Sequence, residues 1–264
     1  MTVRDAADQV LVALDVESLD HAATLLDTLS GAVTGCKIGS QLFTAAGPAA
    51  IEAARKRGFR VFLDLKFHDI PNTVAGAVRE ATRLGVFMLN VHASGGVKMM
   101  RAAAEAATKA AKDLGVPRPI CLGVTVLTSL DRHALDAETG VPATVESHVL
   151  RMAGLARQAG LDGCVASARE IGPLRLQFGK KFVIVTPGIR ALRDEGGLGG
   201  SGTGPPSQTS EAVIATPSGD DQVRTATAGA AIEAGADYIV VGRPITAAPN
   251  PRAAADALLR ELSE

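Results

Sequence analysis

The sequence predicts an α/β protein in which eight parallel strands close into a single (β/α)₈ (TIM) barrel domain over residues 1–264. Two observations predict this fold. Short apolar runs rich in β-branched residues recur eight times, with stretches of helical spacing between them. The length of 264 residues, with 47% hydrophobic content, also suits a barrel of one domain. An open doubly wound sheet is the alternative, but no GxGxxG motif follows the first strand, which argues against a dinucleotide-binding version.

Each expected strand is an apolar run typical of a sheet that is covered on both faces. In chain order the strands are expected at residues 10–15, 33–39, 59–66, 86–92, 120–127, 163–166, 182–185 and 238–241. The helices are expected at 19–29, 48–57, 72–84, 97–114, 145–159, from about 168, at 221–234 and at 252–262. Ser18 can cap the first helix, and Gly58 and Gly85 can close the second and third. This alternation implies parallel pairing with right-handed crossovers.

One segment, residues 191–219, breaks the regular alternation. It is rich in Gly, Ser and Pro, and it is longer than an ordinary connection. It follows the seventh strand, where barrel loops often contact phosphate. Two interpretations stay open, a flexible lid over the site and a disordered surface insertion.

Composition and charge narrow the class of function. The net charge is −1 and the basic residues are scattered, so neither a nucleic acid nor a membrane is expected as a partner. The first residues lack the apolar core of a signal peptide, and no apolar run approaches the length of a membrane span. The three cysteines lie in apolar runs without CxxC spacing, which predicts buried thiols in a reducing cytoplasm.

Charged residues gather at the carboxyl ends of the first three expected strands. Asp64 and Lys66 alternate on the third strand, so both project from one face, and Asp69 follows shortly after. Asp15 ends the first strand and Lys37 lies near the end of the second. Because the chemistry of such barrels sits at this rim, we expect these side chains to converge. A shielded lysine held among carboxylates can stay protonated and donate a proton to a carbanion.

The last two strands end in a different pattern. Gly188 and Gly242 follow them, and Arg243 adds a forked cationic donor, which together suggest a phosphate site. Ordinary glycine turns beside a surface arginine are the alternative. The fourth strand ends in Asn90 and His92, and we expect His92 to be structural because no nucleophile and base accompany it. No HExxH or paired His/Cys spacing suggests a zinc site.

The motifs together resemble the orotidine 5′-monophosphate decarboxylase family over essentially the whole chain. The string DLKFHDIPNT at residues 64–73 resembles the signature of that family. Further matching segments occur in the same order, namely LD at 14–15, KIG at 37–39, VHASGG at 91–96, VLTS at 126–129, VTPGIR at 185–190, DQVR at 221–224 and VGRP at 241–244. The long segment after Arg190 departs from the short connection of typical relatives.

The resemblance implies a reaction and a catalytic group. The reaction is decarboxylation of orotidine 5′-monophosphate to uridine 5′-monophosphate, the last step of de novo synthesis of that nucleotide, with no metal and no organic cofactor. Lys66 would protonate C6 of the pyrimidine, flanked by Asp64 and Lys37. Asp69 of the partner subunit in a homodimer would complete a Lys-Asp-Lys-Asp array.

The resemblance also implies which residues hold the nucleotide. Asp15 and Lys37 would bind the ribose hydroxyls, with Thr73 reaching across from the partner subunit. Thr128 would contact the pyrimidine. The 5′-phosphate would be bound by Gln222, Gly242 and Arg243, with Arg190 near the base of the closing loop.

Two other classes of function remain as alternatives. One is a metal-dependent decarboxylase or aldolase of the same superfamily acting on a sugar phosphate, which would need an acidic metal ligand at the second strand, where this chain has Lys37. The other is a non-enzymatic protein that binds a phosphate ligand. The complete charged array argues against it.

Overall fold

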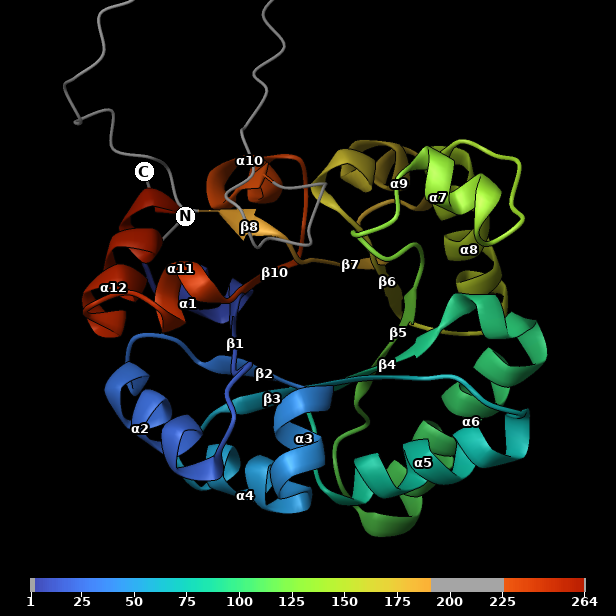
Figure 1. Cartoon of the computed structure of the whole chain (residues 1–264). Coiled ribbons are helices and arrows are strands. Elements are labelled where there is room, and N and C mark those ends of the chain that lie inside the picture. The colour runs from blue at the N-terminus through green and yellow to red at the C-terminus, as the bar shows by residue number, and fades with distance from the viewer. Residues whose placement is uncertain (1–2, 191–225, 264) are drawn as a thin grey trace, which may run out of the picture.

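The computed structural model describes residues 3–190 and 226–263, in which eight parallel strands close into a barrel (Figure 1). The strands are β1 (Val10–Ala13), β2 (Gly35–Gly39), β3 (Arg60–Phe67), β4 (Met88–His92), β5 (Ile120–Val124), β6 (Gly163–Val165), β7 (Val183–Thr186) and β10 (Tyr238–Val241). Each pairs with the next along the chain, and β10 closes the ring by pairing with β1, with Val10 opposite Ile239. The predicted closed barrel is confirmed, and the open sheet is excluded.

Helices surround the ring of strands, as Figure 1 shows looking along the barrel. Those that match the prediction are α2 (Leu19–Leu29), α4 (Pro48–Lys56), α5 (Pro71–Arg83), α6 (Gly96–Leu114), α8 (Val145–Gln158), α9 (Ile171–Phe178), α10 (Ala228–Glu233) and α12 (Pro251–Glu261). The predicted cap is present, because the Ser18 hydroxyl accepts a hydrogen bond from the His21 N–H at 3.2 Å. Four short helices were not predicted, namely α1 (Val3–Gln9), α3 (Ser40–Ala46), α7 (Arg132–Ala137) and α11 (Arg243–Thr246).

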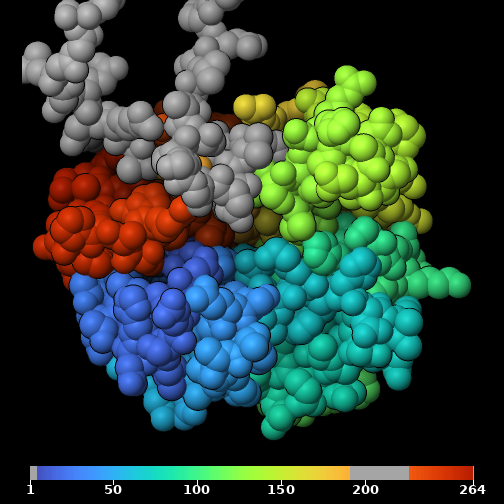
Figure 2. Space-filling model, viewed as in Figure 1, coloured from blue at the N-terminus to red at the C-terminus, as the bar shows by residue number. Residues whose placement is uncertain are grey.

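The space-filling view shows the N-terminal part of the chain (blue) directly beside the C-terminal part (red) (Figure 2). This neighbourhood follows from the pairing of β1 with β10. None of the helices in the described ranges is both long and apolar enough to cross a membrane.

The region after β7 differs from the prediction. Ala226 and Thr227 were expected inside a helix, but they form strand β9 (Ala226–Thr227), which pairs with β8 (Ile189–Arg190). The helix α10 begins only at Ala228, because the Thr227 side chain caps it by accepting the Ala230 N–H. Residues 191–219 and the first part of the predicted helix, 221–225, lie outside the described residues.

Two strands end two or more residues before their predicted ends. The strand β1 ends at Ala13 and not at Asp15, and β5 ends at Val124 and not at residue 127. The residues beyond each strand leave the ladder and enter the loops at the carboxyl end of the barrel. Asp15 and Thr128 therefore lie on loops and not on strands.

The core has two parts. Inside the barrel, apolar side chains from six strands pack together, namely Leu11, Ala13, Phe62, Met88, Leu122, Val185 and Val240. A larger cluster fills the space between the strands and the helices. Because apolar side chains fill the barrel interior, it is a packed core and not a channel.

Charged residues at the amino ends of the strands bind backbone groups. The Asp162 carboxylate accepts the Cys121 N–H at 2.7 Å and a hydrogen bond from Arg118 at 2.6 Å. The Asp237 carboxylate likewise accepts the Ile184 N–H at 2.7 Å and pairs with Arg175. Each of these carboxylates connects neighbouring strands. We infer that the charged residues at this end of the barrel stabilise the fold.

The three thiols should be inert in the folded protein. Cys36, Cys121 and Cys164 are fully buried and free, and burial raises the pKa of each thiol to about 12. Because the thiolate is the reactive form, we expect no labelling by a disulfide reagent at about pH 8. The same reagent should label all three after denaturation, counted by absorbance. Fast labelling of a thiol in the native protein would contradict the burial seen here.

Candidate active site

A cavity of about 1050 Å³ opens at the carboxyl end of the barrel. Part of its wall is apolar and comes from strand residues, including Ala13, Phe62, Val124, Val165 and Val240. Charged side chains surround this wall, namely Asp15, Lys37, Asp64, Lys66, Arg190 and Arg243. The convergence predicted for the strand ends is therefore present for Asp15, Lys37, Asp64 and Lys66, but Asp69 does not take part in it.

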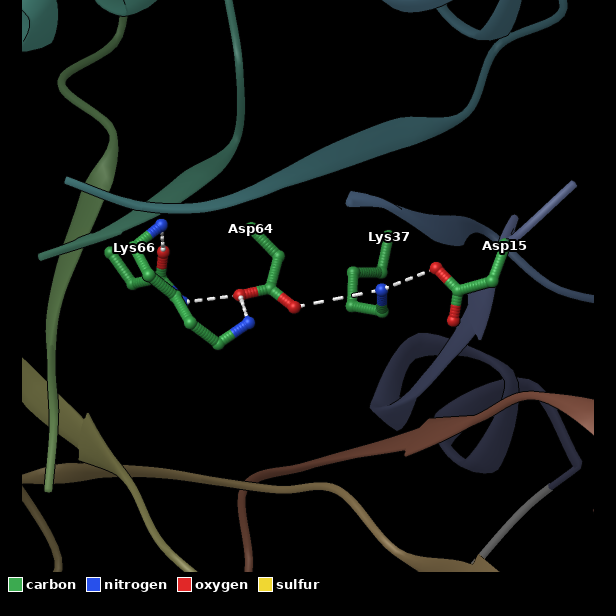
Figure 3. A network of polar contacts seen from close by, with 5 residues as sticks. Asp15, Lys37, Asp64 and Lys66 are labelled. Carbon is green, nitrogen blue, oxygen red and sulfur yellow. Dashed lines mark hydrogen bonds and ion pairs between the residues drawn. The ribbon is translucent and has the colours of Figure 1, made fainter. Parts of the chain in front are cut away.

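Four of these side chains form a row of alternating charge (Figure 3). The Lys66 ammonium donates to Asp64 Oδ1 at 2.7 Å, and Asp64 Oδ2 lies 3.5 Å from the Lys37 ammonium. Lys37 in turn donates to Asp15 Oδ1 at 2.9 Å. The side chains of Lys37 and Asp64 are only 10% and 13% exposed, so water screens their charges weakly. The row is an ordered set of charges, of the kind that can stabilise charge in a bound ligand.

The local fold explains why Lys37 can reach both carboxylates. Lys37 on β2 lies opposite Ala13 of β1 and Phe62 of β3, so it faces the barrel interior between the two acidic strands. Gly39 follows two residues later on the same face. A Cβ atom there would lie 3.0 Å from Lys37 Nζ and 3.1 Å from Asp15 Oδ1. The absence of a side chain at Gly39 therefore leaves the room that this ion pair occupies.

The backbone of β3 is irregular where it carries the row. Its register with β4 shifts between Leu63 and Phe67, and Lys66 has φ 51°. Among the described residues, Lys66 is the only one other than glycine with a positive φ. Its N–H donates to Asn90 Oδ1 at 2.8 Å, and Asn90 Nδ2 donates to Asp64 Oδ1 at 2.7 Å. The sequence placed Asn90 at a strand end but suggested no role for it. The one feature that could have pointed to a role is an amide between apolar residues of a buried strand.

The other predicted ligand residues lie elsewhere around the cavity. Thr128, Arg190, Gly242 and Arg243 line it together with the charged row. Gly188 also lines it and has φ 80°, in the left-handed region that glycine adopts readily. Gln222 lies outside the described residues.

Asp69 and Thr73 do not line the cavity of their own chain. Both are exposed, and an Asp69 carboxylate oxygen accepts the Ile70 N–H at 2.6 Å. The neighbouring Ile70 is 67% exposed, which is high for a large apolar residue. The structure thus brings Asp15, Lys37, Asp64 and Lys66 together and leaves Asp69 and Thr73 on the surface.

His92 lies beside the charged row without joining it. Its ring is partly buried and stands 5.3 Å from the ring of His68. Burial lowers the pKa of His92, and the nearby charges of His68 and Lys66 lower it further. Within the described residues, no group of three or more His, Cys, Asp or Glu side chains is arranged to hold a metal ion.

Comparison with known proteins gives consistent matches. The family model described as "Orotidine 5'-phosphate decarboxylase / HUMPS family" matches residues 8–258. A protein of Moorella thermoacetica named orotidine 5'-phosphate decarboxylase is 51% identical over 97% of this chain and 93% of its own length. One of the same name from Chromobacterium violaceum is 45% identical over 96% of this chain and 91% of its own length.

A solved structure is also similar. The crystal structure of orotidine 5'-phosphate decarboxylase from Lactobacillus acidophilus superimposes with a TM-score of 0.78 at 33% identity. The match covers 97% of this chain and 100% of the other.

The space at Gly39 can be tested by Gly39→Ala. The new methyl group is expected to push Lys37 Nζ away from Asp15 Oδ1, because both atoms lie closer to it than an ordinary van der Waals contact. A crystal structure of the variant should show this ion pair longer than its present 2.9 Å. Gly154→Ala is the matched control, since a Cβ atom at Gly154 meets nothing within 4 Å. An unchanged ion pair in Gly39→Ala would refute the steric role of Gly39.

Proposed function

The chain belongs to the orotidine 5'-phosphate decarboxylase / HUMPS family, and on that premise we propose that the charged row performs the reaction of its relatives. That reaction is the decarboxylation of orotidine 5′-monophosphate to uridine 5′-monophosphate and CO₂, which makes the protein a carbon–carbon lyase of pyrimidine biosynthesis. The observation that carries the proposal is the Lys66–Asp64–Lys37–Asp15 row at the edge of a cavity that also has an apolar wall.

The chemistry needs a cation at the reacting carbon. When the bond between C6 and the carboxylate breaks, its electron pair stays on C6 in the plane of the ring, where the π system cannot delocalise it. The Lys66 ammonium, oriented by Asp64 at 2.7 Å, supplies positive charge there and then donates its proton to C6. Carbon dioxide leaves, and Lys66 regains a proton from water.

The apolar wall strengthens this interaction. Side chains such as Phe62, Val124 and Val165 line the cavity beneath the row. A pyrimidine ring packed against them would exclude water, which lowers the local dielectric and makes the field of Lys66 more effective. The charges are also held in place before the substrate arrives, so little reorganisation is needed during the reaction.

We assign the rest of the nucleotide to the remaining wall of the cavity. Asp15 and Lys37, which line the cavity, would bind the ribose hydroxyls, and Thr128 would contact the pyrimidine edge. Gly242, Arg243 and Arg190 line the same cavity, and their backbone N–H groups and guanidinium groups would bind the 5′-phosphate. Gln222, which the family resemblance adds to the phosphate site, lies outside the described residues.

We further propose a homodimer in which Asp69 and Thr73 act in the partner's site. Both are exposed and absent from the lining of their own cavity. Ile70, between them in the sequence, exposes 67% of its surface, which suits a residue covered by another subunit. Asp69 would then lie at the partner subunit's Lys66 and complete the Lys-Asp-Lys-Asp array.

The metal-dependent alternative is less well supported. A sugar-phosphate lyase that uses a metal needs carboxylates at the second strand, but β2 presents Lys37, which pairs with Asp15 and Asp64.

A cytoplasmic location also belongs to the proposal. Its support is the set of three buried free thiols, which suits a reducing compartment.

Turnover of orotidine 5′-monophosphate in the presence of EDTA tests the reaction. We expect full activity, because the proposed chemistry uses only side chains of the chain. The activity is measured as the decrease in orotate absorbance. Added Mg²⁺ should not change the rate. Absence of turnover by the folded protein, or turnover that EDTA abolishes, would reject the proposal.

Mixed dimers test the shared site. Lys66→Ala and Asp69→Ala are each expected to reduce kcat by at least about a thousandfold, because each removes a charge from the array. Random mixing of the two should restore about a quarter of wild-type activity, since each heterodimer of a two-fold dimer regains one intact site.

Two differently tagged batches of Lys66→Ala, mixed in the same way, serve as the control and should stay inactive. If purified heterodimers of Lys66→Ala and Asp69→Ala are also inactive, Asp69 does not act across the interface. Near-normal turnover by Lys66→Ala alone would remove Lys66 from the mechanism.

A further inference from the structure

Asn90 on β4 is a buried amide that contacts both Lys66 and Asp64 of the charged row. Its side chain is fully buried, and it does not line the cavity. It accepts the Lys66 N–H at 2.8 Å and donates to Asp64 Oδ1 at 2.7 Å. The Lys66 N–H can only donate, so it fixes which end of the amide faces Lys66 and which faces Asp64.

The first contact holds an unfavourable backbone conformation. Lys66 has φ 51°, a left-handed conformation that is unfavourable for a residue with a Cβ atom. The register shift between Leu63 and Phe67 leaves this stretch out of the regular ladder with β4. Asn90 Oδ1 provides the acceptor that the Lys66 N–H would otherwise lack. The amide thus stabilises the turn of the backbone that aims the Lys66 side chain.

The second contact fixes the rotation of the Asp64 carboxylate. Oδ1 accepts from both Asn90 Nδ2 and Lys66 Nζ, each at 2.7 Å. This leaves Oδ2 facing Lys37 at 3.5 Å. A carboxylate held at one oxygen by a rigid amide cannot turn freely about its last bond, so each oxygen keeps its own lysine.

From these two contacts we propose that Asn90 is a positioning residue for decarboxylation, which sets the backbone of Lys66 and the carboxylate plane of Asp64 at the same time. The inference rests on the proposed role of the charged row. It assigns Asn90 no contact with substrate. Its loss should therefore lower kcat and leave substrate affinity nearly unchanged, because the nucleotide is held by other residues.

Asn90→Ala removes both contacts. We expect kcat to fall roughly 100-fold, the scale of a misplaced catalytic group, with KM for orotidine 5′-monophosphate changed less than about threefold. Thr82→Val is the matched control. Thr82 is also a buried polar residue, but its hydroxyl donates to the Val78 carbonyl within α5 and lies away from the cavity lining. This control should keep kcat within about twofold of wild type, since it only alters stability.

Asn90→Asp separates the two contacts and stays nearly isosteric. It keeps an acceptor for the Lys66 N–H, but it can donate to Asp64 only when its own carboxyl is protonated. Two ionised carboxylates this close repel each other, and an ionised Asp at position 90 has no proton to donate to Asp64. The kcat of Asn90→Asp relative to wild type should therefore be highest at acidic pH and fall as the pH rises and the added carboxyl group ionises. A purely structural role gives no such pH dependence.

Three results would overturn the inference. One is a kcat for Asn90→Ala within about threefold of wild type, and another is a loss no larger than that of the Thr82→Val control. The third is that the kcat of Asn90→Asp, divided by the kcat of wild type, stays constant with pH. Lys66→Ala is assayed beside them. If it is inactive while Asn90→Ala is normal, only the role of Asn90 fails, whereas an active Lys66→Ala rejects the proposed function itself.

Discussion

The pairing of Asp64 with two lysines is the interaction on which the rest of the site depends. Lys37 and Asp64 are almost fully buried, and a buried ammonium without a carboxylate would be strongly destabilising. Several local features accommodate this pairing. Gly39 leaves room for Lys37 to reach Asp15, and the irregular β3 turns Lys66 back to Asp64. The site is thus a property of three adjacent strands and not of one motif.

Charges at the two ends of the barrel have different partners. At the amino ends, Asp162 and Asp237 accept backbone N–H groups from neighbouring strands and pair with arginines. They satisfy the chain's own polar groups and connect its strands. At the carboxyl ends, Asp64 and Lys37 bind mainly other side chains at the edge of a cavity. Charges that face a cavity and not the backbone remain able to interact with a ligand, which is why function concentrates there.

Much of this arrangement could be predicted from the sequence, because it depends on periodicity and order along the chain. Alternation alone placed Asp64 and Lys66 on one face, and the position of Ser18 predicted the start of α2. The role of Asn90 could not be predicted. It depends on the register shift between β3 and β4 and on the positive φ of Lys66, which are set by the packing of two strands and not by a local pattern. The short strand at Ala226 was missed for a similar reason, since its partner Ile189 is distant in the sequence.

The chemical nature of Asn90 follows from the charge balance of the row. The lysines at 66 and 37 and the carboxylates at 64 and 15 cancel one another. A carboxylate at position 90 would face Asp64 Oδ1 and repel it, and an ammonium there would compete with Lys66 for that oxygen. An ammonium at position 90 would also leave the Lys66 N–H without an acceptor. An amide supplies one donor and one acceptor in a single plane and adds no charge. It can therefore fix the geometry of the reacting pair without changing the electrostatic field that the substrate experiences.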